Sequence, residues 1–125
     1  MLVVDDTVDT RELYAMCLRI EGFTVSEASD GFEALRSASL HRPHVIIMDL
    51  AMPGLDGWQA TQQLKADAGT CDAIVLVVTG QVVTADLQRA RDMGADDVLT
   101  KPCRPRELIA KVRQFLAART VVPGS

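Results

Sequence analysis

Side chains that can bind a metal ion or a phosphate stand at the ends of short predicted strands in this 125-residue chain. They are Asp5, Asp6, Asp49, Thr79 and Lys101. Carboxylates that converge on one point repel one another, and at least one is driven toward protonation unless a cation is present. Oxygen ligands without nearby cysteine or histidine suit a hard ion such as Mg²⁺, which also binds phosphate oxygens. The set therefore predicts a site that holds a phosphoryl group beside a carboxylate.

Asp49 is the predicted nucleophile of this site. It follows the apolar run at residues 45–48 and precedes a turn-forming cluster at residues 52–57, which would cover the strand end. Attack by its carboxylate would form an aspartyl phosphate, while Mg²⁺ and Lys101 neutralise the developing charge and the Thr79 hydroxyl donates to an oxyanion. Considered without the other site residues, Asp49 could simply be a carboxylate that ends a strand.

Five predicted strands would position these side chains. The unbroken apolar runs at residues 45–48 and 74–78 lack alternation, which predicts strands buried on both faces. Shorter strands are predicted at residues 2–4, 23–28 and 97–100, the second of them at an edge of the sheet. Helices are predicted at residues 7–21, from the Asp30 cap to just before Pro43, and at 58–66, 84–93 and 105–118.

Alternation of strands with helices implies right-handed crossovers and one parallel sheet covered on both sides, the doubly wound α/β class. Ligands bind such sheets at the carboxyl ends of the strands. Apolar residues at helical spacing predict amphipathic helices. The predicted apolar faces are Leu13, Met16, Cys17 and Ile20; Phe32, Leu35 and Ala38; Leu87 and Ala90; and Leu108, Ile109, Val112, Phe115 and Leu116.

Composition limits the function classes. With 48% hydrophobic residues the chain can form one compact domain, predicted at residues 1–119, with residues 120–125 as a tail or a truncated linker. A net charge of -4 and the lack of a basic run argue against direct nucleic-acid binding. The lack of a signal peptide or a long apolar run predicts a cytoplasmic protein without a membrane segment. The odd number of cysteines, 3, predicts free thiols.

Four motifs together resemble the receiver domain of bacterial two-component response regulators. They are VVDD at residues 3–6, IIMDLAMPGLDG at 46–57, VVTG at 77–80 and DDVLTKP at 96–102. The resemblance covers essentially residues 1–118. It implies a flavodoxin-like fold with the strand order 2-1-3-4-5.

The resemblance also implies an acceptor, a metal and a donor. A histidine kinase or a histidine phosphotransfer protein would donate a phosphoryl group to Asp49. Asp5, Asp6, Asp49 and the backbone carbonyl of Ala51 would bind Mg²⁺. The chain would then act as a phosphorylated signalling switch and would not turn over an external substrate.

The resemblance assigns the read-out of phosphorylation to three further positions. Lys101, usually placed by a cis bond to Pro102, would contact the phosphoryl group, and Thr79 would move toward it. This movement would alter the surface formed by the fourth helix, the fifth strand and the fifth helix, where an effector binds. Val98 stands where the family often has an aromatic switch residue, and a valine has little rotamer freedom in a strand, so the output should use another route.

Two other functions compete with this one. A small Mg²⁺-dependent phosphatase would also form an aspartyl phosphate, but such enzymes usually need an aspartate two positions after the nucleophile, where this chain has Ala51. The second competing function is that of a degenerate receiver that serves only as an interaction module. The packing of Trp58, the only tryptophan, close to the site loop makes its fluorescence a test for metal binding.

Overall fold

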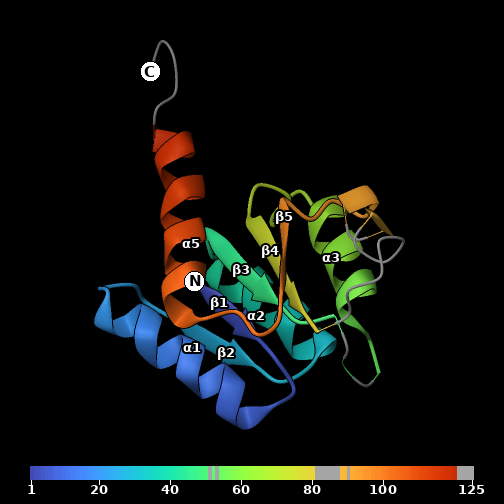
Figure 1. Cartoon of the computed structure of the whole chain (residues 1–125). Coiled ribbons are helices and arrows are strands. Elements are labelled where there is room, and N and C mark those ends of the chain that lie inside the picture. Colours follow the sequence, from blue (N-terminus) through green and yellow to red (C-terminus); the bar gives the residue numbers. More distant parts are fainter. Residues whose placement is uncertain (51, 53, 81–87, 90, 121–125) are drawn as a thin grey trace.

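The sheet consists of five parallel strands in the order β2-β1-β3-β4-β5. The computed structural model describes all residues except 51, 53, 81–87, 90 and 121–125 (Figure 1). The strands are β1 (Leu2–Val4), β2 (Ser26–Ala28), β3 (Val45–Met48), β4 (Ile74–Thr79) and β5 (Asp97–Thr100). This topology confirms the predicted doubly wound class, the strand order and the edge position of β2.

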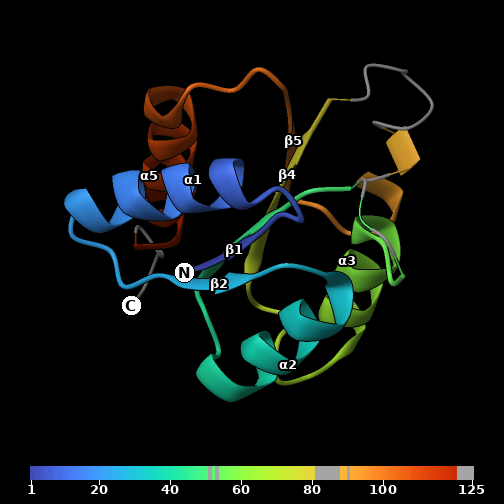
Figure 2. The ribbon, with the colours of Figure 1, turned by 90° about the horizontal axis from the view of Figure 1, so that it is seen from below.

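Helices cover both faces of the sheet. They are α1 (Val8–Ile20), α2 (Gly31–His41), α3 (Gly57–Ala66) and α5 (Pro105–Thr120). Helices α1 and α5 lie on one face, and α2 and α3 lie on the other (Figure 2). Half of the helix predicted at residues 84–93, including Leu87 and Ala90, falls outside the described residues, but residues 88, 89, 91 and 92 are helical. Among the described residues, no helix has the length and apolar character needed to cross a membrane.

The central strands are buried on both faces, as their unbroken apolar runs predicted. In β3, Ile46 and Met48 belong to the apolar cluster under α2 and α3, while Val45 and Ile47 belong to the cluster under α1 and α5. All six residues of β4 are buried as well. Residues 45–48 and 74–78 are therefore apolar at every position, which explains why the period-two alternation is missing, and Thr79 is the polar residue that ends β4.

The predicted apolar face of α1 is wrong. Leu13, Met16 and Ile20 are 44%, 52% and 76% exposed. The side chains of α1 that face the sheet are instead Tyr14, Ala15 and Leu18. Both sets occur at helical spacing, so spacing alone does not show which one is buried. The buried set has the small Ala15 at its centre, which lets α1 pack closely against the sheet.

The other predicted faces are confirmed in part. Phe32 is exposed, whereas Ala34 and Ala38 bring α2 onto the sheet and Leu35 is partly buried. In α5 the predicted face is the one that packs. Its members Leu108 and Val112 are buried, and Ile109, Phe115 and Leu116 pack against the same cluster.

Lys65 and Asp96 close the end of the sheet opposite the predicted site. Lys65 Nζ, at the end of α3, donates to the carbonyl oxygen of Ala73 at 2.7 Å and to Asp96 Oδ2 at 2.9 Å. The same Asp96 oxygen accepts a 2.7 Å hydrogen bond from the Val75 amide. One partly buried ion pair thus joins α3, the start of β4 and the segment before β5.

Gly57 is the position where α3 approaches Asp49 and Leu50, the first residues of the loop at positions 49–56, which we call the acceptor loop. A Cβ atom there would overlap the carbonyl oxygen of Asp49 and would lie 2.7 Å from Leu50 Cα, both of them backbone atoms. We expect Gly57→Ala to lower the free energy of unfolding by about 2 kcal/mol, because backbone cannot move aside as a flexible side chain does. Urea denaturation measures this loss.

Gly69→Ala is the control for that substitution. An added Cβ at Gly69 would meet only Asp67 Oδ1, at 3.5 Å. Its unfolding midpoint should stay close to that of the unaltered chain. Equal stability of the two variants would contradict the close approach of α3 to the loop.

Candidate functional site

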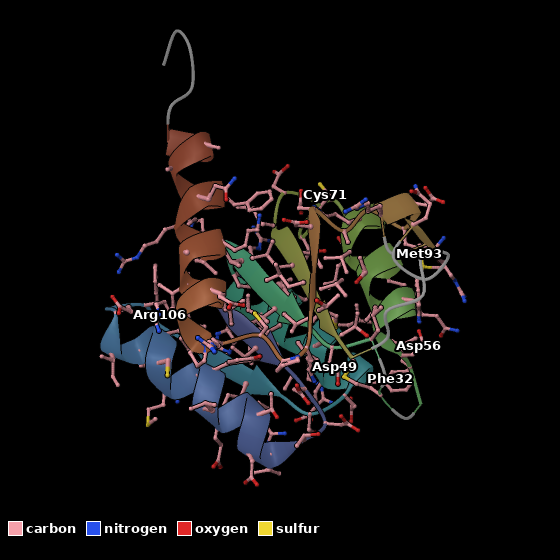
Figure 3. All side chains as sticks on the ribbon, viewed as in Figure 1. Phe32, Asp49, Asp56, Cys71, Met93 and Arg106 are labelled. Carbon is pink, nitrogen blue, oxygen red and sulfur yellow. The ribbon has the colours of Figure 1, made fainter. Side chains whose placement is uncertain are left out.

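Hydrogen bonds that continue the strand ladders bring the predicted site residues to one edge of the sheet. Val4 pairs with Met48, and the Asp49 amide donates to the Val4 carbonyl at 3.0 Å, so Asp5 and Asp49 follow neighbouring strand ends. Figure 3 shows Asp49 at the opposite end of the strands from Cys71. Asp5 and Asp49 therefore lie at the same end of the sheet, as predicted for residues that follow parallel strands.

Three carboxylates meet at this edge. Oxygens of Asp5, Asp6 and Asp49 lie within 4.8 Å of one another. Asp5 and Asp49 are only 3% and 6% exposed, whereas Asp6 is exposed. Asp5 Oδ1 accepts a 2.9 Å hydrogen bond from the Thr7 amide, which fixes this carboxylate at the start of α1.

Lys101 supplies positive charge to the cluster. Its Nζ lies 3.1 Å from Asp5 Oδ2 and 3.7 Å from Asp49 Oδ2. One ammonium group cannot balance three carboxylates, so the cluster retains a net negative charge in a largely buried place. An all-oxygen donor set with this charge fits a hard divalent cation such as Mg²⁺.

Thr79 and Pro102 lie beside Lys101. Thr79 is fully buried at the end of β4, and its carbonyl oxygen accepts a 2.7 Å hydrogen bond from the Lys101 amide. The peptide bond between Lys101 and Pro102 is cis. Val98, in β5, is half-buried and packs against the cluster under α2 and α3. Ala51 lies outside the described residues.

Arg11 is a residue near the site that the sequence argument missed. Its Nη1 donates to the carbonyl oxygen of Asp5 at 3.0 Å, and its Nε lies 3.4 Å from Glu27 Oε1. The side chain therefore ties the loop that carries Asp5 to the edge strand β2. A contact to a backbone carbonyl leaves no motif in the sequence.

Trp58 is buried, as predicted, and it contacts Arg89, which the sequence did not predict. The indole is buried at the start of α3, and Arg89 Cζ lies 4.6 Å from its ring centroid. This is a cation–π contact, which ties the helical residues around Arg89 to the start of α3. The only tryptophan of the chain is therefore placed where changes in that loop can alter its fluorescence.

Tyr14 is another residue near the site that was not predicted from the sequence. Its hydroxyl donates a 2.8 Å hydrogen bond to the carbonyl oxygen of Cys103. Burial raises the pKa of Tyr14 to about 12, and the nearby Cys103 and Asp5 add to the rise. The hydroxyl therefore stays protonated, and able to donate, at pH values well below 12.

The raised pKa of Tyr14 predicts an alkaline transition. The neutral phenol is favoured in the folded chain, so its contribution to stability is complete below pH 10 and is lost as the pH rises toward about 12. Because Tyr14 is the only tyrosine, ultraviolet absorbance of the tyrosinate reports it alone. A midpoint at the ordinary value of 10.0 in the folded chain would contradict the buried hydrogen bond.

Comparison with known proteins agrees with this geometry. DNA-binding response regulator MtrA of Mycobacterium tuberculosis is 36% identical over 116 residues, which cover 93% of this chain and 50% of that protein. RpaA of Synechocystis, a DNA-binding transcriptional regulator, is 34% identical over 98% of this chain and 51% of its own length. The chain thus spans about half the length of these curated relatives.

Solved structures agree with the sequence relatives. Chemotaxis protein CheY4 of Vibrio cholerae has a TM-score of 0.86 and 29% identity, over 90% of this chain and 94% of that one. The family model described as the response regulator receiver domain matches residues 1–113. With the five-stranded fold and the acidic edge already described, these matches show that the chain belongs to the response regulator receiver domain family.

Proposed function

We propose that the chain is a phosphoacceptor switch and that Asp49 is the residue that takes the phosphate. The observation that supports this most strongly is the placement of Asp49 Oδ2 3.7 Å from Lys101 Nζ, inside a cluster of three carboxylates. Both oxygens of Asp5 have other contacts, Oδ1 with the Thr7 amide and Oδ2 with Lys101 Nζ, and Asp6 is exposed. Asp49 follows the central strand β3, between the strand end that carries Asp5 and the one that carries Lys101, so it is the proposed nucleophile.

The reaction is a transfer between two side chains. An oxygen of the Asp49 carboxylate attacks the phosphorus of a phosphohistidine on a histidine kinase or phosphotransfer protein. The new O–P bond forms as the N–P bond breaks, and the leaving imidazole nitrogen takes up a proton. Lys101 Nζ, already beside Asp49, would contact the transferred phosphoryl oxygens.

Receiver domains are generally Mg²⁺-dependent, and the carboxylate cluster of this chain fits that ion. Asp5, Asp6 and Asp49, with the backbone carbonyl of Ala51, would hold it. Bound Mg²⁺ would neutralise charge that develops on the phosphoryl oxygens. The hydroxyl of Thr79, buried at the neighbouring strand end, would donate a hydrogen bond to a phosphoryl oxygen of the phosphorylated form.

The proposed output surface comprises the segment after β4, together with β5 and α5. The contact of Arg89 with Trp58 offers a route between the acceptor loop and that surface that does not need an aromatic residue at Val98. An effector would bind there. The net charge of -4 supports the proposal that the chain itself does not bind nucleic acid, whereas relatives twice its length are named as DNA-binding.

We further propose that the chain turns over no external substrate. A phosphatase with this chemistry would need an acid two residues after Asp49, and that residue is Ala51. The receiver would span residues 1–119, with the remaining residues as a tail or linker, and it would act in the cytoplasm, where kinases with phosphohistidine are found.

Phosphate uptake from a small donor tests the proposal. Incubation with acetyl phosphate and Mg²⁺ should add one phosphate per chain that is stable to acid and labile to base. Borohydride reduction followed by mass spectrometry should place the modification at Asp49. Failure of uptake, or a label at any other residue, would refute the assignment, and steady multiple turnover of a small phosphate ester would favour a phosphatase.

A further inference from the structure

The hydrogen bond from Tyr14 to Cys103 joins two parts of the chain that lie 89 residues apart. Tyr14 is buried on the inner side of α1, and Cys103 is buried in the connection between β5 and α5. Both belong to the apolar cluster between the sheet and these helices. Cys103 is two residues beyond Lys101, so the bond fixes the backbone next to the site lysine.

The connection that carries Lys101 is held from two sides. On one side the Lys101 amide donates to the Thr79 carbonyl at 2.7 Å and ties the backbone to β4. On the other side the 2.8 Å hydrogen bond from Tyr14 ties it to α1. A lysine side chain has four flexible carbons, so its ammonium group keeps a fixed position only when the backbone beneath it is fixed.

The position of the ammonium group matters because it contacts two carboxylates at once. Lys101 Nζ is 3.1 Å from Asp5 Oδ2 and 3.7 Å from Asp49 Oδ2. A shift of about 1 Å would leave one of the two contacts unmade, and misplacement on this scale slows reactions strongly. Tyr14, Lys101 and Cys103 also line the same groove, of about 480 Å³.

We infer that Tyr14 is a positioning residue for Lys101. Its hydroxyl holds the Cys103 carbonyl, and through this carbonyl it holds the backbone that aims the Lys101 ammonium group at Asp5 and Asp49. The inference rests on the proposed function only for its effect on phosphoryl transfer. The placement of Lys101 itself is independent of that function.

Tyr14→Phe is the direct test, because the ring keeps its packing and only the hydroxyl is lost. We expect the rate of phosphorylation by acetyl phosphate to fall about tenfold. Mg²⁺ affinity, measured by Trp58 fluorescence, should change by less than about twofold, since the proposed metal ligands are not touched. Leu18→Val, a buried change one turn further along α1, is the control and should leave the rate unchanged.

A double-mutant cycle separates positioning from a general loss of structure. Lys101→Ala should lower the rate about a hundredfold, as expected for removal of a charge at the reacting group. If Tyr14 acts through Lys101, adding Tyr14→Phe to Lys101→Ala should lower the rate no further. An unchanged rate in Tyr14→Phe alone, or a tenfold loss that persists without the lysine, would overturn the inference.

Chemical labelling of Lys101 gives a readout that does not depend on phosphorylation. Reductive methylation, followed by mass spectrometry, measures how readily the Lys101 amine leaves its two ion pairs. Tyr14→Phe should speed methylation of Lys101 several-fold and leave that of the distant Lys65 unchanged. Equal labelling of Lys101 would refute positioning even if the chain took no phosphate, whereas faster labelling without phosphate uptake would refute only the proposed function.

Discussion

Asp49→Asn is expected to abolish phosphate uptake, with a residual rate below about a thousandth of that of the unaltered chain. The amide is nearly the same size as the carboxylate, but it carries no charge and is not a nucleophile. The fold should survive, because the substitution relieves repulsion from Asp5 and Asp6 while removing one contact of Lys101. Phosphate incorporation from acetyl phosphate, followed by mass spectrometry of the intact chain, measures the effect.

Asp56→Asn is the matched control. Asp56 lies in the same loop as Asp49 (Figure 3), and its side chain caps α3 by accepting from the Gln59 amide at 2.9 Å. Asparagine caps helices as well as aspartate does, so this variant should fold and take up phosphate normally. Equal uptake by Asp49→Asn and the unaltered chain would remove Asp49 from the proposed role.

Asp5→Asn is expected to weaken Mg²⁺ binding about a hundredfold or more. Changes to groups that only support a metal ligand already cost roughly 10- to 100-fold, and Asp5 is a proposed ligand that also contributes a charge. The side-chain oxygen of the new asparagine can still accept the hydrogen bond from the backbone amide of Thr7, so the start of α1 should be preserved. Titration of Mg²⁺ against Trp58 fluorescence, with removal of the ion by chelator, measures the affinity.

Asp9→Asn controls for the loss of one negative charge. Asp9 is exposed in the first turn of α1, outside the carboxylate cluster. Its removal should change Mg²⁺ affinity by less than about twofold, because exposed charges are screened by water and salt. If both variants bind Mg²⁺ equally well, Asp5 is not a ligand and the metal, if bound, lies elsewhere.

The sheet and most of its helices could be predicted because their signals are local. The runs of β3 and β4 are apolar at every position, and only a strand buried on both faces requires that pattern. The orientation of α1 could not be predicted in the same way. Its sequence offers one apolar stripe through Met16 and another through Tyr14 and Leu18, and the choice depends on side chains of the sheet far away in sequence.

The site likewise contains residues that the sequence predicts and residues that it does not. Asp5, Asp49 and Lys101 could be brought together from sequence because each follows a strand, and the ends of parallel strands share one edge. Arg11 and Tyr14 could not, because each uses its side chain to hold a backbone carbonyl in another segment. Such contacts leave no pattern in the sequence, because every residue has a backbone carbonyl and only the folded structure brings the two segments together.

The ion pair of Lys65 with Asp96 anchors the amino ends of β4 and β5 to α3. At the amino ends of β4 and β5, one carboxylate oxygen binds both the Lys65 ammonium group and the Val75 amide. At the carboxyl ends, the strands lead into loops that carry the charged site. Amide hydrogen exchange at Val75 should therefore be slow and should stay slow whatever the state of Asp49, so that any change caused by phosphorylation is confined to the carboxyl ends of the strands.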